Sequence, residues 1–258
     1  MIRKFILMIF CFLPALTFTQ DNQNQHKLFT EILNDYVVDG LVNYKKLKED
    51  ERLDEYITQL EKANPTVYKT RDEKIAFWIN AYNAFTLKFI VDEYPVESIN
   101  DLHWGGLYVG TLLGTTVWDD DKIKINSKMI SLNDIEHKIL RGKYKERRIH
   151  FAVVCASISC PALRSEAYEG YKLNNQLNDQ AYKFFNDESK NKFDSKNRIA
   201  YLSKILDWYA NDFGSSKQEI LLYISQFLND KLRNDISENV DRWNIDYLEY
   251  NWDLNDRK

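Results

Sequence analysis

The feature that most constrains the fold is residues 72–94, a stretch that is apolar on nearly every helical face and ends before Pro95. A helix that is apolar all round is buried, so this segment predicts a helix in the middle of the fold. Asn80 and Asn83 lie about one turn apart on it, and both amides therefore need buried partners. We expect them to bind the backbone near residues 155–161, with the lining of a pocket as the alternative.

The rest of the chain favours an α+β fold that is predominantly helical and forms a single globular domain over residues 20–258. Only 8 Gly and 4 Pro accompany 16 Tyr, 14 Phe and 6 Trp, which disfavours a turn-rich β-sandwich. Apolar residues recur at helical spacing in further segments, namely 26–38, 53–60, 131–141, 175–186, 204–212 and 217–228. The run 147–155 predicts a buried strand, and 40–44 and 105–126 predict short strands, so we expect helices around a small sheet.

Residues 1–19 predict a cleaved signal peptide, because two basic residues precede an apolar run that ends in small residues. That run is shorter than the roughly 20 residues that a membrane-spanning helix needs. We therefore expect export to the periplasm or the medium, with no stable membrane span after cleavage. A retained anchor and a lipid-modified Cys11 are the alternatives.

Charge and motifs exclude several classes of partner. The net charge of −4 has the wrong sign for a surface that binds phosphates, so no nucleic-acid partner is expected. Neither a zinc-type cysteine spacing nor an HExxH helix is present, and there is no phosphate loop or GxSxG elbow, so we expect no metal and no cofactor. A small molecule or a peptide remains as the substrate class.

Cys155 and Cys160 are the cysteines that remain after signal cleavage. In an oxidising compartment they are candidates for a disulfide. Alternatively, one of them is a reactive thiol: Pro161 is typical of a first helical position, which would make Cys160 an N-cap whose thiolate the helix dipole stabilises. Two inert buried cysteines are the third possibility.

A thiol nucleophile needs a base. His150 is the weaker candidate, because in a strand it would face away from Cys155 at about 16 Å. His137 comes from another segment and is preferred, although its neighbour Glu136 does not share its helix face. Asp212 is a candidate to orient the imidazole. Trp208 and Tyr209, close to Asp212, are more typical of a core than of a ligand platform.

Five segments together resemble the domain-of-unknown-function family 547. They are FWINAYNAF at 77–85, DIEHKILR at 134–141, RRIHFAVVCASISCPALR at 147–164, SKILDWYANDFG at 203–214 and IDYLEYNWDLN at 245–255. Their order and number make the resemblance specific over about residues 70–255. It implies a single domain with a shared site, and it implies no particular reaction.

Two functions remain open. One is a thiol-dependent hydrolase or acyltransferase for amide or peptide bonds, with Cys160 or Cys155 as nucleophile and His137 as base. The other is a non-catalytic module that binds a ligand or a protein, with a Cys155–Cys160 disulfide at the rim of its pocket. In both cases the remaining candidates bind substrate or support the site, namely Asn80, Asn83, Glu136, His150, Ser157, Ser159, Arg164 and Asp212.

Overall fold

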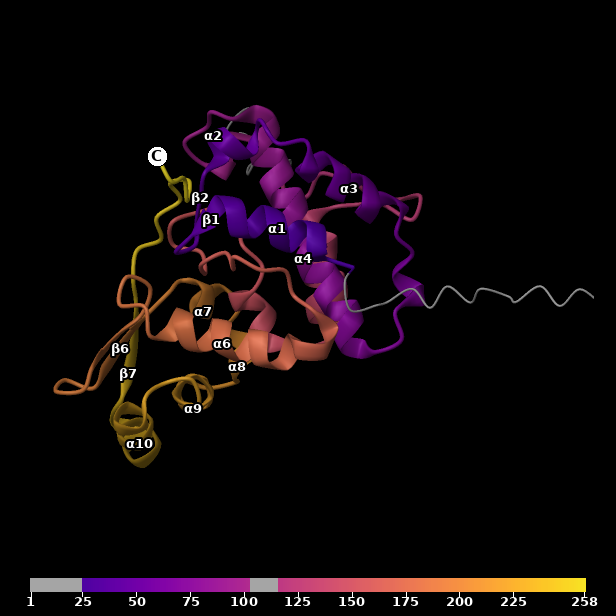
Figure 1. Cartoon of the computed structure of the whole chain (residues 1–258). Coiled ribbons are helices and arrows are strands. Elements are labelled where there is room, and N and C mark those ends of the chain that lie inside the picture. The colour runs from indigo at the N-terminus through magenta and orange to yellow at the C-terminus, as the bar shows by residue number, and fades with distance from the viewer. Residues whose placement is uncertain (1–24, 103–115) are drawn as a thin grey trace, which may run out of the picture.

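A long central helix organises the fold, as the sequence predicts. In the computed structural model, which describes residues 25–102 and 116–258, α4 (Arg71–Glu93) crosses the molecule (Figure 1). Its first turn is closed by a capping box, in which the Thr70 side chain accepts from the Glu73 N–H and the Glu73 carboxylate accepts from the Thr70 N–H. Fourteen of its 23 residues are buried, all of them between Ile75 and Val91, so α4 is the core against which the other elements pack.

The other elements of residues 25–102 precede or follow α4 in the chain, and several of them pack on it. They are α1 (Lys27–Tyr36), β1 (Val37–Val38), β2 (Leu41–Val42), α2 (Tyr44–Leu47), α3 (Arg52–Lys62), η2 (Pro65–Val67) and η3 (Ile99–Leu102). Strands β1 and β2 form a short antiparallel hairpin. Gly40 in its turn has a φ of +81°, and a side chain there would lie 2.6 Å from the Cβ of Ala162. Glycine at this position therefore lets the hairpin pack directly on the segment that follows Cys160.

The middle of the chain is mostly helical turns. Strands β3 (Ile123–Ile125) and β4 (Lys128–Ile130) form an antiparallel hairpin. The next elements are the π-helix η4 (Asp134–Lys143), the 3₁₀ turns η5 (Arg147–Phe151) and η6 (Gly170–Lys172), and α6 (Leu173–Phe185). The Ser131 hydroxyl accepts from the Asp134 N–H at the start of η4.

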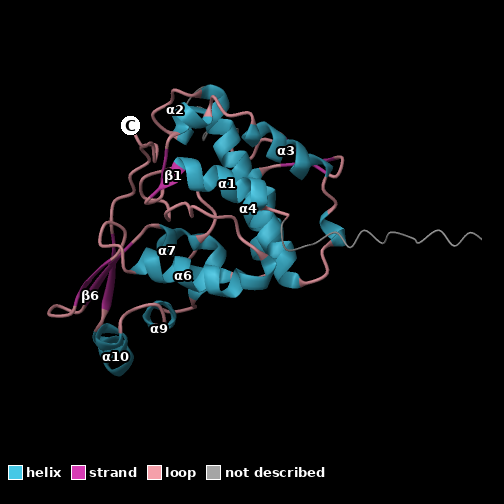
Figure 2. Cartoon of the chain, in the orientation of Figure 1, coloured by secondary structure: helices cyan, strands magenta, loops and turns pink. Residues whose placement is uncertain are grey.

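The C-terminal part builds a second, smaller apolar cluster. Its elements are β5 (Lys192–Asp194), β6 (Ile199–Leu202), α7 (Ile205–Trp208), α8 (Ala210–Phe213), α9 (Lys217–Ser225), α10 (Asp230–Asn239), η7 (Val240–Arg242) and β7 (Asn244–Tyr247). Strand β6 pairs antiparallel with β5 and parallel with β7. Figure 2 shows that helices dominate over these short strands. The predicted class, α+β and predominantly helical in a single domain, is confirmed.

Two local predictions are wrong. Residues 147–155 are not a strand: η5 occupies the first five, and irregular backbone follows as far as Cys155. Burial explains the error, because Ile149 belongs to the core around α4 and Phe151 to the second cluster, and a buried 3₁₀ turn gives the same apolar run as a buried strand. No helix begins at Pro161, so Cys160 is not an N-cap.

Some predictions fall partly or wholly outside the described residues. The signal peptide at 1–19 does so, as does the first part of the hairpin expected at 105–126, of which β3 is present with a partner further along the chain. Across 25–102 and 116–258, no helix has the length and apolarity to cross a membrane.

Candidate functional site

An aromatic pocket of about 210 Å³ lies beside the two cysteines. Its aromatic lining comes from distant parts of the chain: Tyr82, Trp118, Trp208, Tyr209, Tyr250 and Trp252. Glu136, His150 and Asn133 supply polar groups, while Cys155 and Cys160 line it with Pro161. An apolar hollow with a few convergent polar groups is the usual form of a small-molecule site.

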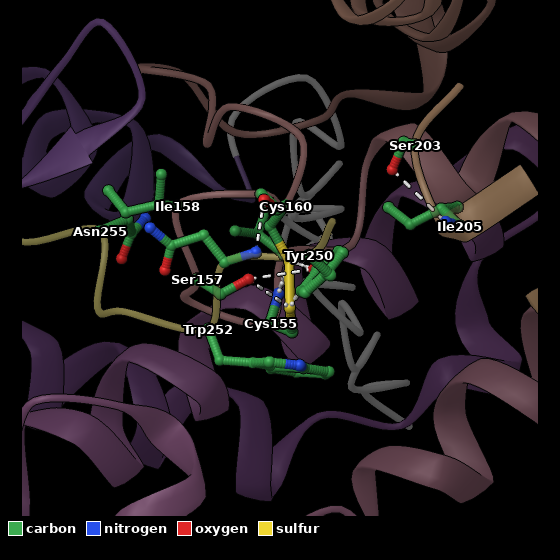
Figure 3. Close-up of a disulfide and its surroundings, with 12 residues drawn as sticks. Cys155, Ser157, Ile158, Cys160, Ser203, Ile205, Tyr250, Trp252 and Asn255 are labelled. Atoms are coloured by element: carbon green, nitrogen blue, oxygen red, sulfur yellow. Dashed lines mark hydrogen bonds between the residues drawn. A yellow bond between two sulfur atoms is a disulfide. The ribbon is translucent and has the colours of Figure 1, made fainter. Parts of the chain in front are cut away.

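Cys155 and Cys160 form a disulfide, so the first of the three sequence-based alternatives is confirmed. Their Cα atoms are 6.2 Å apart, and the bond closes the loop of residues 155–160 (Figure 3). Ala156 turns this loop with a φ of +61°, a left-handed conformation that is uncommon outside glycine. The loop is therefore held in one shape by a covalent bond as well as by its neighbours.

Backbone pairing fixes the loop against the C-terminal segment. The N–H of Ile158 donates to Asp253 at 2.8 Å, and the N–H of Asn255 donates to Ala156 at 3.0 Å. The Ser159 hydroxyl accepts from the Asn251 N–H at 2.9 Å. These contacts bring Tyr250 and Trp252 to the disulfide (Figure 3).

The two central asparagines hold the backbone on either side of this loop. The amide of Asn83 donates to the carbonyl of Ala152 and accepts from the N–H of Val154, both at 2.9 Å, which confirms a buried contact just before Cys155. Asn80 is equally buried, but it forms the same pair of bonds with Tyr168. The prediction that Asn80 binds near 155–161 is therefore wrong. Asn80 instead secures the segment that returns towards α6.

Polar groups surround the sulfur atoms. The backbone N–H of Cys155 donates to the Sγ of Cys160 at 3.0 Å. Tyr250 Oη lies 3.3 Å from each sulfur and donates to that of Cys160, while the Ser157 hydroxyl donates to Tyr250 at 3.0 Å. Burial raises the pKa of Tyr250, so its hydroxyl keeps its proton at neutral pH.

A chain of acid and base groups leads away from the pocket. The Nε2–H of His150 donates to the Asp212 carboxylate at 2.6 Å, and the Nδ1 of His150 lies 3.9 Å from Glu136. Arg141 donates to the Asp212 carboxylate through Nε and Nη2 at 2.6 and 3.0 Å. Its Nη1 lies 2.9 Å from Nδ1 of His137. Hydrogen bonds from His150 and Arg141 hold the pKa of Asp212 well below its usual range.

Glu136 acts on the tyrosines at the same end of the pocket. Burial, reinforced by the nearby Glu136 carboxylate, raises the pKa of both Tyr82 and Tyr209. The ring of Tyr209 stacks on His150 with centroids 4.2 Å apart, and Arg141 lies 4.7 Å above the same ring. The imidazole is thus fixed by both a carboxylate and a ring face.

The structure brings together some of the predicted site residues and separates others. Glu136, His150 and both cysteines line the pocket, and Asp212 contacts His150. His137 contacts Arg141 and is not part of the described pocket lining. Arg164 binds Asp179 and Glu166 and is not in the described pocket lining.

Sequence reasoning missed the aromatic wall. Trp208 is 49% exposed and does not belong to a core, contrary to the prediction. Its ring lies 4.8 Å from Tyr250, and Tyr250 lies 4.5 Å from Trp252, measured between centroids. Trp118 extends the group at 5.9 Å from Trp252. The available signal was the recurrence of Trp and Tyr in the DWYANDF and YNWDLN segments.

No group of three or more His, Cys, Asp or Glu side chains within the described ranges is arranged to hold a metal ion. With the sulfurs bonded to each other, the pocket offers ring faces, one carboxylate, one imidazole and the disulfide. These groups suit binding of a partly apolar molecule and, with a thiol, disulfide chemistry.

Comparison with known proteins identifies one related family. The family described as "Protein of unknown function, DUF547" matches residues 66–185, which confirms the resemblance that the motifs predict. The match includes α4, Glu136, His150 and both cysteines, and it ends before Trp208 and Tyr250. No curated protein and no solved structure matches the chain.

Proposed function

We propose that the protein is an exported ligand-binding module whose disulfide-closed loop forms one wall of an aromatic pocket. The single observation that carries this proposal is that Cys155 and Cys160 are bonded to each other in the lining of that pocket. A bonded pair offers no thiolate nucleophile, whereas it holds the wall in a fixed shape. A preformed wall lowers the entropic cost of binding.

The lining indicates the chemistry of the ligand. A pocket of about 210 Å³ suits a small molecule or a single side chain of a peptide. The faces of Trp208, Tyr250 and Trp252 favour a flat or apolar part, and Glu136 with Asn133 favours a polar part that donates hydrogen bonds.

Ligand-detected NMR with a library of small polar aromatic and aliphatic compounds tests the proposal. We expect compounds that bind the native protein to lose binding in Trp252→Ala and Trp208→Ala. Tyr171→Ala is the matched control, because Tyr171 is 68% exposed and does not line the pocket. Equal binding by all three variants, or no binding by the native protein at millimolar concentration, contradicts the proposal.

Export is a separate part of the proposal, supported by the apolar N-terminal run and by a disulfide, a bond that persists in oxidising compartments. Intact-mass analysis of the protein recovered from its native fraction should find an N-terminus within a few residues of Gln20. A chain that still carries Met1 contradicts cleavage.

A second candidate is the thiol-dependent hydrolase or acyltransferase, in a reduced form of the protein. It is favoured by His150, which shares the pocket with Cys155 and is oriented by Asp212 at 2.6 Å, as in nucleophile–base–acid arrangements. Here His150 replaces His137 as the base. After reduction, iodoacetamide should label Cys155 faster than Cys160, and His150→Gln should slow that labelling while His137→Gln should not. Labelling of Cys155 that is indifferent to His150→Gln contradicts this candidate.

A further inference from the structure

The two sulfurs of the disulfide have different surroundings. Cys160 is buried at 4% exposure, whereas Cys155 is only partly buried. Disulfide exchange requires that an incoming thiolate approach one sulfur, and access decides which sulfur it attacks. Both cysteines line the pocket, and Cys155 is the more exposed residue, which favours attack at its sulfur.

Both sulfurs lie near hydroxyl groups, and the Sγ of Cys155 is 3.3 Å from both Ser157 Oγ and Tyr250 Oη. The difference between the sulfurs is a backbone donor at Cys160. The Sγ of Cys160 accepts from the backbone N–H of Cys155 at 3.0 Å and from the Tyr250 hydroxyl at 3.3 Å. Bonds of this kind stabilise a thiolate over a thiol and lower its pKa, and a sulfur of lower pKa leaves faster in exchange. These contacts therefore favour the sulfur of Cys160 as the leaving group.

Ser157 orients the hydroxyl group of Tyr250. Because the Ser157 hydroxyl donates to Tyr250 Oη at 3.0 Å, the proton of Tyr250 is available for a sulfur. Burial raises the pKa of Tyr250, so that proton is retained near neutral pH. The Tyr250 hydroxyl has one proton, which it can donate to one sulfur at a time. The backbone N–H of Cys155 is a second donor, and it bonds the Sγ of Cys160.

We propose that the Cys155–Cys160 pair exchanges with the thiol of a molecule bound in the aromatic pocket, with Cys155 as the attacked sulfur and Cys160 as the leaving sulfur. This inference rests on the proposed pocket, and it adds a reaction and a ligand class. The thiol belongs either to a small molecule or to a cysteine side chain on a peptide, since both fit the same space.

The first step conserves atoms and electrons. A thiolate RS⁻ attacks Sγ of Cys155, the Cys155–Cys160 bond breaks as the new R–S–S–Cys155 bond forms, and Cys160 leaves as a thiolate. A second thiolate R′S⁻ then attacks the sulfur of R, which gives R–S–S–R′ and a thiolate at Cys155. The protein pair gains two electrons, the two thiols lose them, and their two protons pass to the cysteines or to water.

The experiment mixes the oxidised full chain with reduced glutathione, or with a short peptide that contains one cysteine, and stops the reaction with acid and then N-ethylmaleimide. Peptide mapping should find the mixed disulfide on Cys155 and the maleimide on Cys160. The unstructured peptide CASISC is the reference, and the folded protein should open at least tenfold faster. A mixed disulfide on Cys160, an even distribution, or a rate no faster than that of the peptide overturns the proposal.

Tyr250→Phe separates the chemistry from the fold. It should slow opening about five- to tenfold, the effect of losing one hydrogen bond to the leaving sulfur, and Tyr171→Phe should not. In the reduced protein, the pH profile of alkylation should place the pKa of Cys160 below that of Cys155 and show it rising in Tyr250→Phe. Ser157 is a positioning residue, so in Ser157→Ala the pKa of Cys160 should also rise, but to a smaller degree. An unchanged pH profile in Tyr250→Phe overturns the assigned role.

S-methylglutathione distinguishes failure of exchange from failure of the pocket. Because it has no thiol, it should bind and compete without reacting. If the probe binds but glutathione does not exchange, the proposed binding pocket is supported and the proposed exchange reaction is refuted. A different result is that the probe does not bind and that Trp252→Ala exchanges as fast as the native protein. The thiol then does not bind in the aromatic pocket, and the inference is overturned.

Discussion

Asn83 shows how one side chain replaces a missing stretch of secondary structure. Its amide gives Ala152 a donor and Val154 an acceptor, as a neighbouring strand would, although residues 152–154 are irregular. Asn83 is 3% exposed, so the two bonds are shielded from bulk water. The start of the cysteine loop is therefore fixed by a residue on α4.

Replacing Asn83 by Leu should lower the free energy of unfolding by about 1–3 kcal/mol, because the N–H and carbonyl that it serves are left buried and unpaired. Urea denaturation measures the change. Asn197→Leu is the control, since the amide of Asn197 binds Asp194 in an exposed turn. Unfolding curves that coincide for Asn83→Leu and the native protein would refute the structural role of this amide.

Glu169 gives the molecule a pH dependence of known sign. Burial raises its pKa to about 7, with Glu166 adding to the rise and Lys172 opposing it. In the unfolded chain the carboxyl titrates near its ordinary value of about 4.5, so between about pH 4.5 and 7 the unfolded state releases a proton that the folded state keeps. This group is therefore neutral for stability below that window and costs stability as the pH rises through it.

Glu169→Gln removes this cost while preserving the shape of the protonated acid. The variant should match the native protein at pH 4 and exceed its free energy of unfolding by about 1–2 kcal/mol at pH 8, because the buried, ionised carboxyl of Glu169 destabilises the native protein there. Denaturation series at the two pH values measure the difference, in which titration of other groups cancels. A variant that is no more stable than the native protein at pH 8 would show that burial does not raise the pKa of Glu169 above its ordinary value.

At the scale of elements, the sequence predicts those helices that carry an apolar stripe or are apolar all round. The predicted segments 26–38, 53–60 and 72–94 correspond to α1, α3 and α4. Helix α10 was not predicted because Ile236 is its one buried residue, too little for a stripe. Strands β5, β6 and β7 escaped because each has three or four residues, and β6 pairs with a segment more than forty residues away.

The candidate site was predictable only in part, for a related reason. The cysteine pair, Glu136 and His150 lie within one family-like stretch, where their chemistry is visible in the sequence. The aromatic wall is assembled by tertiary contacts from Trp118, Trp208 and Trp252, and no spacing rule connects these positions. The orienting contact of His150 with Asp212 was hidden by the wrong strand assignment at 147–155.

The capping box of α4 offers a test at this scale. Thr70→Ala removes the acceptor of the Glu73 N–H and should lower the free energy of unfolding by about 1 kcal/mol. Thr66→Ala is the matched control, because the exposed Thr66 hydroxyl binds the neighbouring Asn64 and caps no long helix. Thermal unfolding measures both, and an equal effect of the two substitutions would contradict a specific contribution from the cap.

The whole molecule is closed by its last residues. After β7 the chain runs back along the protein to the N-terminal hairpin (Figure 1), pairing with Ala156 on the way and with Val42 at its end. Asn255 joins the two regions: its N–H donates to Ala156, its carbonyl accepts from Val42, and its amide binds Tyr44 and Gly40. The pocket wall and the hairpin therefore share one support.

Asn255→Ala should loosen both regions at once. It leaves the buried Tyr44 hydroxyl and the Gly40 carbonyl without their partner, which should lower the free energy of unfolding by about 2–3 kcal/mol. Hydrogen exchange followed by mass spectrometry should then show faster exchange in residues 37–42 and 155–160 together, because the same C-terminal segment holds both. Asn197→Ala should change neither segment. Faster exchange in 37–42 alone would mean that the disulfide and Asn83 suffice to hold the loop, and that the C-terminal segment stabilises the hairpin without supporting the pocket.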